Sequence, residues 1–219
     1  MIGWGLTAQI AQAIMLFVPG TLHFWQGWAF MVVNFTVLLV LCIYLYRHDR
    51  QLLARRMLRK EKIGTQKIII FLIKEAIVIV CALSGLDHRF GWSRTYLMTV
   101  PWWLTGLALL FYAGGYLLYI PVMRANRFAA TIIQIEAGQT VSDHGPYRIV
   151  RHPMYAVGII LWFWMPLALG SLIALPVALL IVPLLMWRLL NEEKMLRREL
   201  PGYAEYCRRT PYRLIPQVW

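Results

Sequence analysis

The feature that most constrains the fold of this chain is a series of long apolar runs. The runs hold about 16 to 27 residues, and a helix of about 20 residues crosses roughly 30 Å of hydrocarbon. Because 60% of the 219 residues are apolar and only 15% are charged, the composition departs from that of soluble domains, which average about 45–50% and about 25%. The sequence predicts an all-α, polytopic integral membrane protein with five to six transmembrane helices. The candidate spans are residues 6–22, 28–46, 68–86, 96–122, 154–169 and 172–190.

The first apolar run is the reason for the range of five to six helices. It is interrupted by Gln9, Gln12 and the pair Pro19-Gly20. It also lacks the basic start and the small-residue cleavage site of a signal peptide. We therefore expect this run to be a retained, short span.

Lysine and arginine are distributed unevenly between the spans. Residues 47–67 hold eight of them, residues 123–153 hold four and residues 188–219 hold seven, whereas the opposite side carries only Arg89 and Arg94. Basic loops mark the cytoplasmic side of membrane proteins, so both termini are expected in the cytoplasm. This orientation accounts for the net charge of +12 without nucleic-acid binding. The short loops and compact size favour a bacterial inner-membrane location.

Few polar residues lie within the spans. The three cysteines form neither a disulfide framework nor a metal-ligand spacing, so we expect no metal site. Asn34 is expected to pack or to bond between helices. The adjacent Lys74 and Glu75 form an ionisable pair in a span, which indicates either a functional site or a snorkelling lysine beside a carboxylate that reaches a basic loop.

Most other polar residues fall in two segments, 126–155 and 188–213, that flank the last helical hairpin. The two segments should therefore lie close together and form one cytoplasm-facing site. In the first segment Pro153 begins a span, which leaves helix N–H groups beside Arg151 and His152 that suit an anion. An interfacial anchor followed by a helix-starting proline explains the same residues equally well.

The second segment begins with Arg188 and, one helical turn later, Glu192. Arg188 suits an anion at the membrane surface, and Glu192 suits hydroxyl groups or a cation. A surface salt bridge between the two residues is the plainer interpretation of this spacing. On these grounds we divide the chain into N-terminal transmembrane helices, residues 1–122, and a functional region, residues 123–219.

The motifs of this second region resemble those of the isoprenylcysteine carboxyl methyltransferase family, which is related to phospholipid N-methyltransferases. The resemblance extends from residue 126 to residue 219 and depends on five motifs. They are Asn126-Arg127-Phe128, Gly145-Pro146-Tyr147, Arg151-His152-Pro153-Met154-Tyr155 with Gly158, Arg188 with Glu192-Glu193, and Gly202-Tyr203 with Glu205-Tyr206.

The resemblance implies a membrane enzyme that transfers a methyl group from S-adenosylmethionine to a lipophilic acceptor arriving from the bilayer. It implies that Arg188 and Glu192 are catalytic and that Arg188, with Arg151, binds the acceptor. It further implies that the cofactor contacts Gln134, Gln139, Val141, Tyr147, His152, Pro153, Tyr155 and Glu192.

The favoured reaction is carboxyl O-methylation of an isoprenylcysteine-like substrate. A carboxylate is already an anionic nucleophile, so the reaction needs positioning rather than a general base. Phospholipid N-methylation is an alternative acceptor chemistry. Because the Tyr212-Arg213 ending also resembles sterol reductases, an NADPH-dependent reductase is a further alternative, and a small transporter or membrane scaffold is the non-enzymatic one. The sequence leaves the oligomeric state open.

Overall fold

The computed structural model describes residues 10, 13–14, 17, 19–20, 22–57, 61, 63–126, 128 and 138–219. Within these residues the chain is helical, and no strand occurs among them, as the sequence predicts. The helices are α2 (Trp25–His48), α3 (Arg50–Met57), α4 (Gly64–Phe90), α5 (Trp92–Tyr96), α6 (Trp102–Ala125), η1 (Gly145–Arg148), α7 (Pro153–Ala168), α8 (Leu175–Leu179), α9 (Ile181–Glu199) and α10 (Tyr203–Arg209).

Four stretches of helix are long and apolar enough to cross a membrane: α2, α4, α6 and the consecutive helices α8 and α9, taken together as Leu175–Glu199. The predicted span 154–169 corresponds to α7, which has 16 residues and is therefore about 24 Å long. It is shorter than the hydrocarbon layer, so within the described residues four of the predicted spans have the length of a transmembrane helix. Most of the predicted span 6–22 lies outside the described residues.

The last predicted span differs from the observed helices in two ways. The helix is interrupted at Leu180, between α8 and α9, because Pro183 lacks an N–H group and its ring crowds the carbonyl four residues earlier. α9 then continues to Glu199, nine residues beyond the predicted end at 190. Arg188 and Glu192 therefore lie within one continuous helix.

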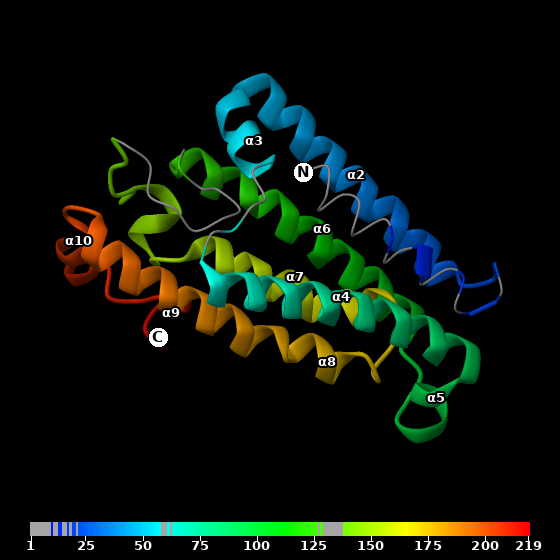
Figure 1. Cartoon of the computed structure of the whole chain (residues 1–219). Helices are drawn as coiled ribbons and strands as arrows, with labels where there is room; N and C mark the ends of the chain where they lie inside the picture. The colour runs from blue at the N-terminus through cyan, green and yellow to red at the C-terminus, as the bar shows by residue number, and fades with distance from the viewer. Residues whose placement is uncertain are drawn as a thin grey trace.

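The long helices run alongside one another as an elongated bundle, with α3 and α10 at one end and α5 at the other (Figure 1). α6 and α7 form the most extensive helix pair. Gly115 lies at their close approach, where a Cβ atom would come within 2.7 Å of Leu161 Cδ2 and force that side chain to shift. α2 joins this core through a hydrogen bond from the Tyr112 hydroxyl to Asn34 Oδ1 at 2.9 Å, which confirms the predicted interhelical bond.

At the end of the bundle that carries α5, the buried carboxylate of Asp87 joins α4 to its neighbours by hydrogen bonds. Asp87 accepts hydrogen bonds from the Ser93 backbone N–H at 2.6 Å, from the Ser93 hydroxyl, and from the Ser171 hydroxyl at 2.5 Å. The Ser93 oxygen in turn accepts the backbone N–H of Leu172 at 3.0 Å. These bonds hold the turn between α7 and α8 against α4 and so help to fix the position of α9.

Candidate functional site

A cavity of about 330 Å³ lies between the helices and the segment 138–147, a volume within the usual range for ligand pockets. Helices α2, α4, α7 and α9 contribute mainly apolar side chains to it, including Leu41, Ile73, Leu161, Trp162 and Leu185. The polar lining comes from α3, the residue that follows α6, the segment 138–147, the start of α7, α9 and α10. It includes Arg56, Asn126, Gln139, Thr140, Ser142, Tyr147, Arg151, His152, Tyr155, Arg188, Glu192, Tyr203 and Tyr206.

The polar wall is anchored by Glu193 of α9, whose side chain is almost fully buried. Its carboxylate accepts hydrogen bonds from Arg151 Nε at 2.7 Å and Arg213 Nε at 3.1 Å, and lies 3.2 Å from His152 Nε2. The Arg151 guanidinium also donates to the carbonyls of Thr210 and Pro211. Glu193 thereby joins the start of α7 and the C-terminal segment to α9.

The C-terminal segment is further attached to the site through the backbone. Arg151 and His152 donate their N–H groups to the carbonyls of Tyr212 and Arg213, both at 2.9 Å. The Tyr206 hydroxyl donates to the carbonyl of Tyr147 at 2.7 Å. The residues before α7 are therefore held from both sides, which fixes the direction in which His152 and Tyr155 enter the cavity.

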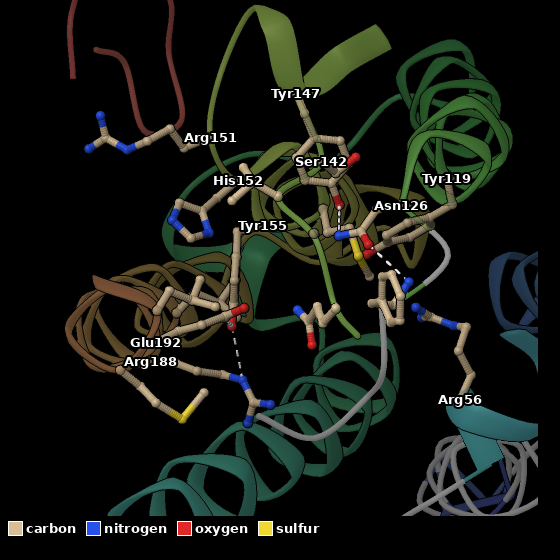
Figure 2. A pocket seen from close by; sticks show the side chains of 18 of the residues that line it. Arg56, Tyr119, Asn126, Ser142, Tyr147, Arg151, His152, Tyr155, Arg188 and Glu192 are labelled. Atoms are coloured by element: carbon tan, nitrogen blue, oxygen red, sulfur yellow. Dashed lines mark hydrogen bonds between the residues drawn. The ribbon is translucent and has the colours of Figure 1, made fainter. Parts of the chain in front are cut away.

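Tyr155 connects Arg188 and Glu192, the two residues for which the resemblance implies a catalytic role. Its hydroxyl donates to Glu192 Oε2 at 2.6 Å and accepts from Arg188 Nε at 3.1 Å. Arg188 Nη2 also lies 3.8 Å from Glu61 Oε2, a distance longer than a hydrogen bond. Figure 2 shows Arg188, Tyr155 and Glu192 facing the same cavity.

Asn126 and Tyr147 form the opposite part of the polar wall. Asn126 Nδ2 donates to the Tyr147 hydroxyl at 3.3 Å, and Asn126 Oδ1 accepts the backbone N–H of Phe128 at 3.0 Å. The Ser142 hydroxyl donates to the carbonyl of Ala125. Burial raises the pKa of the Tyr147 phenol to about 12, so this hydroxyl stays protonated at neutral pH.

Two further cavity residues, Arg56 and Tyr203, are absent from the predicted site residues, although Tyr203 belongs to one of the five motifs. Arg56 reaches the cavity from α3, on the same side as Tyr119 (Figure 2). Burial lowers the pKa of its guanidinium, whereas the Tyr119 hydroxyl acts in the opposite direction. Tyr203 of α10 is buried, and its hydroxyl has no hydrogen-bond partner within the described part of the chain. An orphaned buried hydroxyl beside a cavity is suited to a polar ligand.

The cavity brings together most of the residues predicted for the site. Gln139, Val141, Tyr147, Arg151, His152, Tyr155, Arg188 and Glu192 all line it. Pro153 is buried as the first residue of α7 and does not line the cavity, while Gln134 lies outside the described residues. The roles of these residues remain predictions. In the sequence, Arg56 is one of the eight basic residues in the loop 47–67. No motif or spacing predicts that it lies close to residues 123–219.

Residues 103–201 match the family model of phospholipid methyltransferase. The matched segment is just under half of the chain and runs from α6 through the end of α9, the part that supplies most of the polar wall. The match confirms a membrane methyltransferase that uses S-adenosylmethionine as its methyl donor, and it does not favour the reductase or the transporter. A comparison with curated proteins finds no match.

Proposed function

We propose that this membrane methyltransferase transfers the methyl group to the carboxylate of a lipophilic acceptor, of which an isoprenylcysteine is the model. The observation that supports the proposal is the position of Arg188. Along α9, Arg188 lies between Leu185, which belongs to the apolar lining of the cavity, and Glu192, which belongs to the polar lining. A guanidinium at this boundary would hold a carboxylate while the attached hydrocarbon chain lies against Leu161 and Trp162.

The polar part of the cavity fits S-adenosylmethionine by its donor set. Glu192 would accept hydroxyl groups or pair with a cation, and the faces of Tyr147 and Tyr155 would lie against a cationic or aromatic group. The orphaned hydroxyl of Tyr203 would find its partner in the same ligand. When bound, S-adenosylmethionine supplies an electrophilic methyl group on a sulfonium ion.

The residues of the chain would act by orientation and by exclusion of water. Arg188 would hold the acceptor so that one carboxylate oxygen faces the methyl carbon. In the transfer the O–C bond forms, the C–S bond breaks and its electron pair remains on sulfur. No proton has to move. Because the reaction neutralises one positive and one negative charge, an apolar wall that excludes water favours it.

Phospholipid N-methylation is the second candidate, favoured by the description of the matched family. An amine nucleophile must lose a proton, and Glu192 would be the group in the cavity to accept it. In this case Arg188 would bind the lipid phosphate rather than a carboxylate. The two candidates therefore use the same residues with different acceptor atoms.

The decisive experiment uses the purified full-length protein in liposomes with methyl-labelled S-adenosylmethionine. An N-acetyl-S-farnesylcysteine and a phosphatidylethanolamine are offered as acceptors in separate reactions. A methyl ester releases labelled methanol in alkali, whereas an N-methyl group is stable. We expect base-labile label on the farnesylated acid. Base-stable label on phosphatidylethanolamine alone would replace the first candidate by the second.

A further inference from the structure

One face of α4 points away from the bundle and carries a carboxylate in its middle. The apolar residues of this face are clearly exposed: Ile68 by 56%, Phe71 by 59%, Leu72 by 38% and Ile79 by 46%. Glu75 lies among them and is exposed as well. Since residues three, four and seven apart share one side of a helix, these five residues form a single stripe, here called the outer face of α4.

Glu75 lies in the membrane-spanning part of the helix. α4 has 27 residues, a length of about 40 Å, and Glu75 is about 16 Å from its start. Its helical neighbours Ile73 and Ala76 are buried in the bundle, so the Glu75 side chain points in the other direction. A carboxylate directed toward hydrocarbon is costly unless it is paired.

The monomer offers Glu75 no partner in the described part of the chain. No ion pair or hydrogen bond there involves the side chain of Glu75 or of the adjacent Lys74. Lys74 is partly exposed at the edge of the outer face. Consecutive residues of a helix point about 100° apart, so the two side chains diverge rather than face each other. Two opposite charges therefore stand side by side, each directed outward.

We propose that the outer face of α4 is an interface between two copies of this chain, in which each Glu75 pairs with Lys74 of the other copy. Copies related by a two-fold axis along the membrane normal place their α4 helices parallel. If Glu75 lies at the centre of the interface between the two parallel helices, its side chain inserts between four residues of the facing helix: Phe71, Lys74, Glu75 and Val78. This arrangement brings each carboxylate next to an ammonium group, which offsets the repulsion between the two Glu75 carboxylates that face each other.

A second copy fits this face better than a lipid or an unrelated helix. A face that carries one acidic and one basic side chain is complementary in charge to the same face of another copy. Two-fold symmetry forms the pair twice and leaves neither charge without a partner. Snorkelling would take Lys74 toward the membrane surface and leave Glu75 unpaired in the hydrocarbon. The pairing also leaves the cavity accessible, since α4 lines it through Ile70 and Ile73, which lie off the outer face.

The test measures association of the full-length protein in liposomes by energy transfer between two labelled pools. We expect wild-type copies to associate. Lys74→Glu or Glu75→Lys places like charges together and should weaken self-association at least about tenfold, or 1.4 kcal/mol. The double exchange, Lys74→Glu with Glu75→Lys, should restore association to within about threefold of wild type. Arg198→Glu, an exposed site on α9, is the control and should change nothing.

Mixing the two single variants gives the sharpest result. One copy then presents two acidic side chains and the other two basic side chains, so the mixed pair should form more readily than either variant pairs with itself. Binding of S-adenosylhomocysteine verifies that each variant is folded. A monomeric wild type, a double exchange that does not recover, or a mixture without preferred pairing would each overturn the proposal. None of these readouts requires methyl transfer.

Discussion

The hydroxyl of Tyr155 lies between the Glu192 carboxylate, 2.6 Å away, and the Arg188 guanidinium, 3.1 Å away. Tyr155 belongs to α7 and the other two residues to α9, so the contact crosses between the helices of the last hairpin. One side chain thereby orients both a cation suited to the acceptor and a carboxylate suited to the cofactor. The relative position of the two substrates would depend on this hydroxyl.

Tyr155→Phe tests this dependence. The ring still fills its place, but both hydrogen bonds to charged groups are lost, which should cost about 1.5–3 kcal/mol. We expect turnover to fall about ten- to a hundredfold, with a much smaller change in affinity for S-adenosylhomocysteine. Single-turnover methylation and calorimetry on the same preparation measure the two effects. Arg198→Ala is the matched control, and equal losses of turnover and affinity would indicate a pocket that is merely distorted.

Glu192→Ala and His152→Ala test the cofactor end of the cavity. Both residues line it, and loss of a charge-assisted hydrogen bond to a ligand should weaken S-adenosylhomocysteine binding about ten- to a hundredfold. Isothermal titration calorimetry on the purified variants provides the affinities. Wild-type affinity in both variants would mean that these side chains serve only as interfacial anchors.

Glu193 should matter for stability in a way that its neighbour Glu192 does not. Glu193→Ala leaves the buried Arg151 guanidinium without its carboxylate, and breaking one side of a buried ion pair costs about 3–5 kcal/mol. We expect the free energy of unfolding to fall by about that amount, measured by denaturant titration in detergent. Glu199→Ala, at the exposed end of α9, should leave stability unchanged. A variant as stable as this control would remove Glu193 from the structural core of the site.

The different positions of Glu192 and Glu193 show how far sequence reasoning reaches at this site. Helical spacing selected Glu192 as the partner of Arg188, because four residues place both on one side of a helix. It could not show that Tyr155 stands between them, since that contact comes from another helix. Nor could it show that Glu193, turned about 100° further, faces Arg151 and Arg213. Hydrophobic runs predicted the helices, but contacts between helices required the packed bundle.

The same limit explains why Arg56 was missed. Positions of lysine and arginine along a sequence predict the side of the membrane on which a loop lies, but not which of eight basic residues turns inward. Arg56 lines the cavity because α3 folds back after α2, so that Leu52 of α3 packs with Met123 near the end of α6. That path lies outside the segment that matches the methyltransferase family. Residues on both sides of the predicted division at residue 122 therefore line the cavity.

Arg188 provides the test of the acceptor chemistry. If it holds a carboxylate, Arg188→Ala should lower turnover strongly and change cofactor affinity by less than about threefold, because the lost contact belongs to the acceptor. Arg188→Lys should restore only part of the activity, since an ammonium group keeps the charge but loses the two-pronged geometry that fits a carboxylate. Turnover of the farnesylated acid and calorimetric affinity for S-adenosylhomocysteine are measured on both variants.

The competing account makes Arg188 a support for the cofactor pocket through Tyr155 and Glu192. Under that account turnover and cofactor affinity would fall in parallel in Arg188→Ala, and the lysine variant would recover most of both. Tyr155→Phe separates the accounts further, because a supporting role predicts that it reproduces the Arg188→Ala phenotype in full. A role in acceptor binding predicts instead that KM for the acceptor rises mainly in the Arg188 variants.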